Sequence, residues 1–398
     1  MAITAGPGAR MNFAFDAEQG ELSEVLRDAL GREAPVSRWL GSEFDTAADP
    51  AWDVLARHLQ ALAPDLPAEH GGLGLSSVEL AIVAEETGRV VSPAAFTASV
   101  ALAQSLLSAA VRSGSGEPAA RAALERAALG IRYAVISDLL ALMAGPTTEA
   151  LSAEANATEL SFTLSGSGLG SDRTTVSGRA SVPAGALGAQ RLLVLAAGPG
   201  LPVLADVDMA AAVMKPAGGI DPTAGSALVT FEDAPAVLLL EAEAVTAVAA
   251  AARNRARLII AAQALGGARA CLDLTVQYAG QRIQFGVPIG SFQAVKHRLA
   301  DLFVEIELAA SAVYLAACEQ AAGADSGRLS GLAALDTATE VFVRAARDSI
   351  QLHGGMGFTW EHPAHVYLGR ALLFASLLGP QQAAREQMYS LAGERLSA

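Results

Sequence analysis

Several residue types that would point to particular functions are scarce in this sequence. The 398 residues include two cysteines, Cys271 and Cys318, and both fall inside apolar stretches with helical spacing. This argues against a disulfide framework or a cysteine-based metal site and predicts a reducing compartment. Lys and Arg number 27 against 41 Asp and Glu, a formal charge of −14, and no basic cluster occurs. Nucleic acid and anionic membranes are therefore not expected as partners.

Long uninterrupted hydrophobic runs are also missing. The first residues lack a charged start followed by an apolar run, so no signal peptide is predicted. The most apolar windows, such as 237–252, are rich in alanine and are interrupted by Glu241 and Glu243. This favours buried helices over a membrane span. We expect a cytoplasmic protein without a membrane-spanning segment, long enough for two or three domains.

Helix-forming and strand-forming patterns divide the chain into three parts. Residues 1–130 are predicted to be mostly helical, with Asp16 capping the first helix. Within 131–240, short β-favouring runs alternate with glycine, serine and proline, as in a small antiparallel barrel or sandwich. Residues 241–398 show long helical patterns at 253–280, 292–323 and 331–353 and a shorter one near 363–378, enough for an antiparallel four-helix bundle. The predicted fold class is therefore α+β and multidomain.

The joint between the first two of these long helical patterns carries the strongest motif. Residues 282–293 read RIQFGVPIGSFQ, in which glycine and proline end one helix and Ser291 is a candidate N-cap for the next. Arg282 and Gln293 therefore flank one loop, where both side chains could reach the same ligand. A guanidinium is a permanently charged planar fork that suits a pyrophosphate, and an amide can complete the contact. Taken alone, Arg282 is more simply a charge on a solvated helix end.

This motif resembles the signature of the acyl-CoA dehydrogenase family, Arg-x-x-Phe-Gly followed by Phe-Gln. The matching residues here are Arg282, Phe285, Gly286, Phe292 and Gln293. In that family the arginine, the phenylalanine and the glutamine hold the FAD of a neighbouring subunit. The resemblance therefore implies FAD as the cofactor and these three residues as contacts to it.

A second motif resembles the same family. Residues 351–363 read QLHGGMGFTWEHP, which matches the family pattern Q-x-x-G-G-x-G-[FY]-x-x-E-x-P. Gly354 and Gly355 would let the backbone approach a pyrophosphate closely, and free amides there favour an anion. With Gln351 they complete the set of predicted FAD contacts. Glu361 is expected to cap a helix or to form a salt bridge.

Other candidate sites have simpler structural explanations. His353, His362 and His365 cluster near the second motif, but no Cys, Asp or Glu with ligand spacing accompanies them. We therefore expect histidines bonded to the backbone, and no metal site. The glycines of 71–74 and the helix at 79–89 resemble a family turn and helix, and no strand precedes the glycines, so a turn is favoured over phosphate binding.

The chain departs from the family where the chemistry should occur. Typical members have a strand ending in Thr-Glu-Pro-x-x-Gly-Ser-Asp that contacts the flavin and the acyl-CoA, whereas residues 133–138 here read YAVISD and run into LLAL. Removing a proton α to a thioester requires a carboxylate against the substrate. The two places where the family keeps that glutamate correspond to Gly379 and Ala256, and neither is acidic. No catalytic residue is therefore assigned.

Kept FAD motifs beside a lost base resemble one subunit type of bacterial α2β2 acyl-CoA dehydrogenases. The resemblance implies a subunit of an FAD-dependent oxidoreductase of lipid metabolism that dehydrogenates acyl-CoA thioesters at the α,β-bond, including steroid side-chain thioesters. A homologous partner would carry the glutamate, and an electron-transfer acceptor would reoxidise the flavin. Two alternatives remain open: a homomeric flavoenzyme with an unrecognised acid, and a non-catalytic scaffold or binding protein with this fold.

Overall fold

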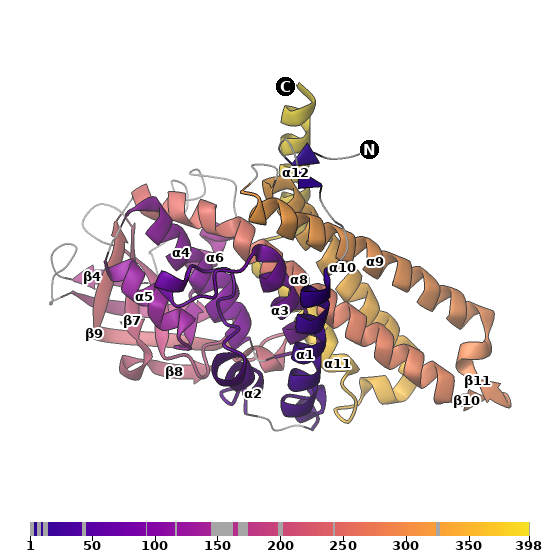
Figure 1. Cartoon of the computed structure of the whole chain (residues 1–398). Helices are drawn as coiled ribbons and strands as arrows, with labels where there is room; N and C mark the ends of the chain where they lie inside the picture. The colour runs from indigo at the N-terminus through magenta and orange to yellow at the C-terminus, as the bar shows by residue number, and fades with distance from the viewer. Residues whose placement is uncertain are drawn as a thin grey trace.

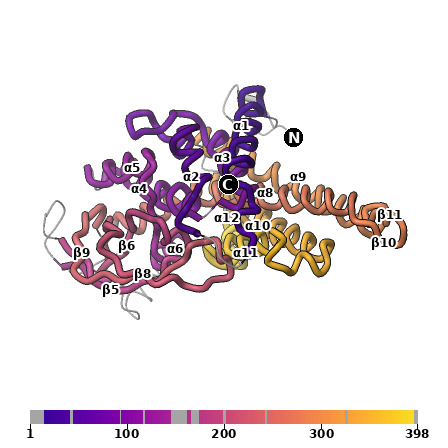
Figure 2. The backbone as a smooth tube through the Cα atoms, turned by 90° about the horizontal axis from the view of Figure 1, so that it is seen from below, coloured from indigo at the N-terminus to yellow at the C-terminus, as the bar shows by residue number. Residues whose placement is uncertain are grey.

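The middle part of the chain forms a sheet, which lies at one side of the molecule, and the parts of the chain before and after it are helical (Figure 1). The computed structural model describes residues 4–5, 9–10, 15–41, 45–92, 94–115, 118–144, 162–165, 174–197, 202–241, 243–323 and 327–397. Seen from below, the sheet lies at one end of the molecule and the ends of two long helices lie at the other (Figure 2). The N-terminal helices pack beside the middle of these long helices.

The N-terminal helices are α1 (Ala17–Glu33), α2 (Pro50–Asp53), α3 (Ser77–Arg89), α4 (Gln104–Ser113) and α5 (Ala119–Ala128), with a π-helical segment η2 at Val54–His58. The prediction that Asp16 caps the first helix is confirmed, because its carboxylate accepts a hydrogen bond from the Gln19 backbone at 2.9 Å. The helical stretch that begins at α2 ends at His58, and Gln60 beyond it adopts a left-handed φ of 51°. A left-handed residue cannot continue a right-handed helix.

The middle strands close into a small barrel, as predicted. They are β3 (Tyr133–Val135), β4 (Phe162–Ser165), β5 (Thr175–Val182), β6 (Arg191–Ala197), β7 (Pro202–Asp208), β8 (Val213–Pro216) and β9 (Ala227–Glu241). The ring runs β6-β4-β5-β9-β7 and back to β6, with β3 and β8 paired at its edges. Most pairings are antiparallel, as predicted, but β3 and β4 each pair with β6 in parallel. A parallel neighbour needs a crossover connection, which α6 (Ser137–Ala144) begins after β3.

Helix α6 replaces the end of the strand expected at 133–138, while residues 133–135 form β3. The strand ends at Val135, and the following apolar residues are helical. Leu139, Leu140 and Met143 are buried, which is the spacing of one helix face rather than the alternation of a strand. Periodicity in this short run therefore predicts the observed element better than the comparison with a family strand does.

The four-helix bundle predicted at the C-terminus is confirmed, and a fifth helix follows it. Its members are α8 (Glu243–Gln281), α9 (Gln293–Ala321), α10 (Gly327–His353), α11 (Ala364–Leu377) and α12 (Gln381–Ser397). Helix α8 begins at Glu243, before the predicted residue 253, because the intervening segment is rich in alanine, which favours helix. Within the described chain, Ala244–Gln281 is long and apolar enough to cross a membrane, but 78% of its apolar window is buried in the fold. A core helix passes the same test.

Glycines set the crossing of α3 and α8. A Cβ added at Gly88 would lie 2.0 Å from the carbonyl oxygen of Gln263, and one added at Gly266 would lie 1.9 Å from that of Glu85. The two backbones are therefore in direct contact, and no side chain fits at either position. This contact fixes the N-terminal helices against the middle of α8.

A buried arginine connects all three parts of the chain. Arg370 on α11 donates to the Asp221 carboxylate at 2.5 Å, to the Thr223 hydroxyl at 2.9 Å and to the Ser92 carbonyl at 2.7 Å. Asp221 and Thr223 lie in the β-rich part, and Ser92 follows α3. Removing one member of such a buried charged network leaves unpaired charge, so the network holds the three parts in fixed positions.

Candidate functional site

The first predicted motif forms the tip of a helical hairpin. Helices α8 and α9 extend past the rest of the molecule and are joined by strands β10 (Ile283–Gln284) and β11 (Val287–Pro288) (Figure 1). The turn residues Phe285 and Gly286 have φ values of 52° and 82°. Two consecutive left-handed residues are typical of a type I′ turn, the form that matches strand twist. The loop predicted from glycine and proline is therefore a tight β-hairpin.

The cap of α9 differs from the prediction. Its N-cap is Phe292, which makes no side-chain capping bond, instead of Ser291. The Ser291 hydroxyl donates to the Pro288 carbonyl at 2.6 Å and so closes the short 3₁₀ turn η7 (Ile289–Ser291). Because η7 inserts between β11 and α9, the helix begins later than a simple Ser cap indicates.

Phe285 combines backbone strain with exposure. Its φ of 52° places a bulky residue in the left-handed region, which costs about 1–2 kcal/mol for a residue other than glycine. Its side chain is 92% exposed, and its ring meets the Phe292 ring edge-on, with ring centroids 6.2 Å apart. Backbone strain that is not offset by packing within the chain is characteristic of a residue positioned for contact with a ligand or another protein.

Arg282 and Gln293 stand on either side of this turn and are both exposed. The backbone of Arg282 is fixed, since its amide donates to the Tyr278 carbonyl and its carbonyl accepts from the Ile289 amide, both at 2.8 Å. Among the described residues, neither the Arg282 guanidinium nor the Gln293 amide has a hydrogen-bond or ion-pair partner. The backbone of Arg282 is therefore held in place, while its guanidinium remains available to a ligand.

The second motif begins at the end of α10 and continues into the 3₁₀ turn η8 (Gly354–Phe358). Gly354 needs its glycine for a φ of 63°, while Gly355 has an ordinary φ. A Cβ added at Gly354 or Gly355 would meet nothing within 4 Å, so nothing in the described chain covers this backbone. Gln351, one turn before, is exposed. The prediction of an open backbone at these glycines agrees with this geometry.

A stack of rings holds the two motifs together. The Tyr278 ring lies 4.3 Å from the His353 ring, and the His353 ring lies 4.1 Å from that of His362. Tyr278 is one helical turn, about 6 Å, before Arg282, and His353 directly precedes Gly354. The six residues predicted to contact FAD therefore lie at the same end of the molecule, at the tip of the hairpin and in the adjoining loop.

The histidines of this stack bond to the backbone, as predicted. Nδ1 of His353 lies 2.7 Å from the Ser349 carbonyl, and Nδ1 of His365 lies 2.6 Å from the His362 carbonyl. Burial together with the neighbouring histidines lowers the pKa of His362 to about 4, so this ring is neutral near pH 7. Among the described residues no group of histidine, cysteine and carboxylate side chains could hold a metal ion.

The expectation for Glu361 is wrong. Its side chain is exposed and, within the described part of the chain, neither caps a helix nor pairs with a base. Helix α11 has Pro363 as its N-cap, without a side-chain capping bond. Proline fixes φ at a helical value, so the helix starts without a capping carboxylate.

These residues fit one side of an FAD site. The hairpin tip and the adjoining loop after α10, together called the tip from here on, offer a free guanidinium, two glutamine amides and open glycine backbone, which suit a pyrophosphate. The tip also exposes the apolar side chains Ile283 (53%), Phe285 (92%), Met356 (46%), Phe358 (83%) and Trp360 (54%). All six predicted contact residues are exposed, so this end of the chain would cover a dinucleotide on one side only.

The end of helix α6 lies against Gly379, one of the two positions where the family has its catalytic glutamate. Gly379 has a φ of 91°, and a Cβ added there would lie 2.8 Å from the Cβ of Ala144, the last residue of α6. The other position, Ala256, is fully buried in α8. Helix α6, which follows β3 where the family has its Thr-Glu-Pro motif, therefore lies against the position of the missing glutamate.

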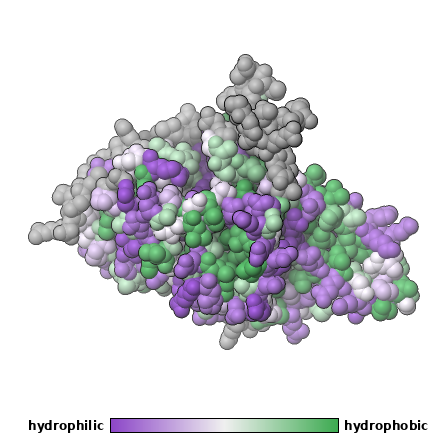
Figure 3. Space-filling view, viewed as in Figure 1, coloured by the Kyte–Doolittle hydropathy of each residue, from purple (hydrophilic) through white to green (hydrophobic). Residues whose placement is uncertain are grey.

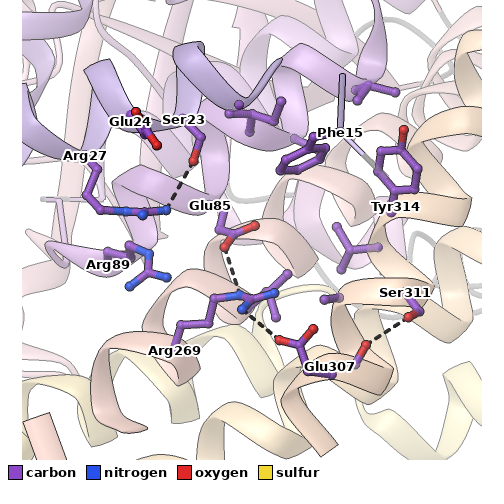
Figure 4. Close-up of a pocket in the computed structure, with 17 residues that line it drawn as sticks. Phe15, Ser23, Glu24, Arg27, Glu85, Arg89, Arg269, Glu307, Ser311 and Tyr314 are labelled. Atoms are coloured by element: carbon purple, nitrogen blue, oxygen red, sulfur yellow. Dashed lines mark hydrogen bonds and ion pairs between the residues drawn. The ribbon is translucent and has the colours of Figure 1, made fainter. Parts of the chain in front are cut away.

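One partly buried acid lies beside a cavity that the sequence did not reveal. Glu85 lines a cavity of about 470 Å³ between α1, α3, α8 and α9 (Figure 4). Burial raises its pKa, although Arg269 lies only 3.1 Å away and opposes this. Arg269 also bonds to Glu307 at 2.8 Å, so the carboxylate belongs to a chain of ion pairs. Arg269 is 13 residues after Ala256 on α8, roughly 20 Å away. The cavity is therefore separate from the Ala256 position, and Gly379 is not among the residues that line it.

Comparison with known proteins agrees with the arrangement of these elements. The acyl-CoA dehydrogenase N-terminal domain matches residues 16–128, and the acyl-CoA dehydrogenase C-terminal domain matches residues 246–393. The barrel between them, where the sequence departs from the family motif, is matched by neither.

Individual relatives show the same likeness. Acyl-CoA dehydrogenase IpdE2 of Mycobacterium tuberculosis is 49% identical over 127 residues, which cover 31% of this chain and 37% of that protein. The match thus spans well under half of the curated relative. Two solved structures extend over 96% of the chain and 99% of their own: a variant of the Tcur3481-Tcur3483 steroid ACAD, with 26% identity and a TM-score of 0.74, and the ChsE4-ChsE5 complex from Mycobacterium tuberculosis, with 22% and 0.74.

Both family domains thus occur in their expected order around a barrel, with the two C-terminal signature motifs at one end of the bundle. The members of the family that carries these domains are FAD-dependent flavoproteins. By its domains, its fold and its motifs, the chain belongs to the acyl-CoA dehydrogenase family.

Proposed function

We propose that this chain is the non-base subunit of a heteromeric, FAD-dependent acyl-CoA dehydrogenase. The observation that carries the proposal is the contrast between its two functional regions. The Arg282 side chain is exposed and has no partner among the described residues, while its backbone is held by two hydrogen bonds. Position 379, by contrast, is a glycine packed against the end of α6. In this proposal the chain keeps the exposed residues that would contact FAD bound to another subunit. It lacks the glutamate that would remove a proton from a substrate of its own.

In this proposal the tip closes the FAD site of the partner. Arg282 would pair with the pyrophosphate, because its fork can make two charge-assisted hydrogen bonds at once. The amides of Gln293 and Gln351 would complete that contact, and Phe285 would cover an apolar part of the dinucleotide. When bound, FAD supplies the acceptor for the hydride leaving the β-carbon of the acyl-CoA. The glutamate that removes the α-proton would come from the partner.

Exposed hydrophobic surface supports an obligate partner. Outside the tip, α9 exposes Phe303 (53%), Val304 (56%) and Leu308 (62%) on one face. Figure 3 shows hydrophobic surface over this helix and toward the tip. Contiguous apolar surface of this kind marks a protein interface. Helix α9 leads directly away from Gln293, so a subunit covering this face would meet the tip as well.

The names of similar structures support a proposal for the class of substrate and partner. The Tcur3481-Tcur3483 structure is described as a steroid ACAD and carries two component names, and the ChsE4-ChsE5 structure is a complex of two components. We therefore propose a homologous second subunit, an α2β2 assembly, and a steroid side-chain CoA thioester as substrate. An electron-transfer acceptor would reoxidise the flavin. A cytoplasmic location is proposed from the net charge of −14 and the unpaired cysteines.

A homomeric enzyme is the second candidate, because Glu85 is a partly buried acid with a raised pKa beside a cavity. Purification of the full chain alone and with its homologous partner separates the two functions. The proposal predicts acyl-CoA dehydrogenase activity only in the complex, and activity that survives Glu85→Gln. A chain that is yellow and active alone, and that loses activity in Glu85→Gln, would establish the homomeric enzyme instead.

A further inference from the structure

The first turns of α8 contain two buried arginines with contrasting partners. Arg255 makes a bidentate ion pair with Asp65, at 2.7 and 2.8 Å, and also donates to the Val100 carbonyl. Arg257 is as deeply buried, with 5% of its surface exposed. The hydrogen bond that the described structure gives its guanidinium goes to the neutral side-chain oxygen of Gln387 on α12, at 3.2 Å.

More donors without acceptors surround Arg257. Arg253 lies one turn earlier on the same helix face and donates to the Leu142 carbonyl at 3.1 Å, while its buried Nε has no partner among the described residues. The side-chain nitrogen of Gln387 is also buried and lacks a partner in the same part of the chain. Arg328, at the exposed start of α10, adds a further positive charge. Burial and the charges of Arg253 and Arg328 lower the pKa of Arg257 to about 10.

This set contains donors and positive charge, and none of the described carboxylates contacts it. Burying a guanidinium without a counter-charge is unfavourable, and buried polar nitrogens are normally hydrogen-bonded. A hydrophobic ligand or a cation would leave every one of these groups unsatisfied. Water could accept single bonds but would leave the charge uncompensated. Only an anion with several acceptor oxygens meets both needs.

We propose that Arg253, Arg257 and Gln387 form a binding site for a compact oxyanion, a phosphate or a carboxylate group. The site is distinct from the flavin-contacting tip, because Arg257 precedes Arg282 by 25 residues of α8, roughly 37 Å along the helix. The Leu142 carbonyl that accepts from Arg253 lies on α6, whose last residue lies against Gly379. The anion would therefore be bound next to the position where the family has a carboxylate and this chain has none.

Anion-dependent thermal unfolding of the full chain tests this site. Inorganic phosphate and sodium acetate are each compared with sodium chloride at equal ionic strength, so that general screening cancels. Wild type should melt several degrees higher in at least one of the two oxyanions, as expected for a ligand that binds only the folded state. Comparison of phosphate with acetate identifies which oxyanion is preferred.

Arg257→Met keeps the volume and removes the charge. It should abolish the oxyanion effect and, in chloride alone, should unfold at the same or a higher temperature than wild type, because an uncompensated buried charge is gone. Gln387→Leu should weaken oxyanion binding about tenfold in calorimetric titration, since it removes one neutral donor. The control is Arg57→Met, which removes an exposed arginine paired with Asp53 and should respond like wild type.

A purely structural role for Arg257 gives a different pattern. In that case Arg257→Met would lower the melting temperature equally in chloride and in the oxyanions. The proposal is overturned by that result, by a wild type that ignores both oxyanions, or by an oxyanion effect that persists in Arg257→Met. If Arg257→Met does not fold, an unchanged oxyanion affinity in Gln387→Leu overturns it instead.

Discussion

Replacing Arg282 by alanine should release FAD from the complex without disturbing this chain. Its side chain is exposed and, in the described structure, without a partner, so the substitution removes no contact within the chain. Exposed substitutions of that kind change stability by at most about 0.5 kcal/mol. At the cofactor the same change removes a bidentate, charge-assisted partner of a pyrophosphate buried between subunits. Truncating one member of a buried charge pair costs on the order of 2–4 kcal/mol.

A cost of this size corresponds to roughly thirtyfold to a thousandfold weaker FAD binding, because each 1.4 kcal/mol is about tenfold. Flavin retained after dialysis of the complex measures it, with gel filtration to verify that the assembly is intact. Arg282→Lys keeps the charge but not the fork and should lie between wild type and alanine. Gln293→Ala removes a neutral donor and should cost less than Arg282→Ala.

Lys296→Ala is the matched control, since it removes a positive charge from the first turns of α9 and should leave flavin bound. His365→Ala should be nearly silent, because this ring bonds to the His362 backbone within the loop. If Arg282→Ala holds its FAD as tightly as wild type, the cofactor does not contact this hairpin. If Lys296→Ala loses as much FAD as Arg282→Ala, general charge and not the guanidinium fork governs binding.

Two further predictions concern stability. Gly88→Ala should destabilise the chain by about 3 kcal/mol or more, because its Cβ would lie 2.0 Å from the Gln263 carbonyl, whereas Gly31→Ala, with nothing within 4 Å, should stabilise by about 0.5–1 kcal/mol in urea unfolding. Burial raises the pKa of Asp49 to about 6 from 3.8, so wild type should lose stability as the pH rises between these values. Asp49→Asn keeps an N-capping oxygen but cannot titrate in this range. Its free energy of unfolding relative to that of wild type should therefore rise by up to about 3 kcal/mol between pH 4 and pH 7. If this difference in unfolding free energy stays constant with pH, Asp49 titrates normally.

Local signals in the sequence predicted the helical parts well. The cap at Asp16, the helical bundle and the tight turn before α9 each depend on residues close together in the chain. The barrel was predicted from strand spacing, but its parallel pairings were not, because spacing along the chain does not reveal which strands pair or in which direction. Glu361 and Ser291 were misassigned because nearby alternatives, a proline start and an inserted 3₁₀ turn, replaced the expected caps.

The candidate site could be predicted only in part. Motif spacing placed Arg282 and Gly354 near a common ligand, and the Tyr278–His353 contact now joins their loops. The contact between Gly379 and α6 could not be read from the sequence, because it joins residues more than two hundred positions apart. That Arg257 has no carboxylate partner among the described residues was equally hidden, since a sequence does not reveal which of several neighbouring arginines on one helix pairs with a carboxylate.

The FAD content of the purified complex tests the central claim most directly. Only the partner is proposed to carry a flavin-facing barrel surface, so flavin released by denaturation should amount to about one FAD for every two chains. This chain purified alone should carry little or none. One FAD on every chain, or a yellow and active assembly of this chain by itself, would contradict the account.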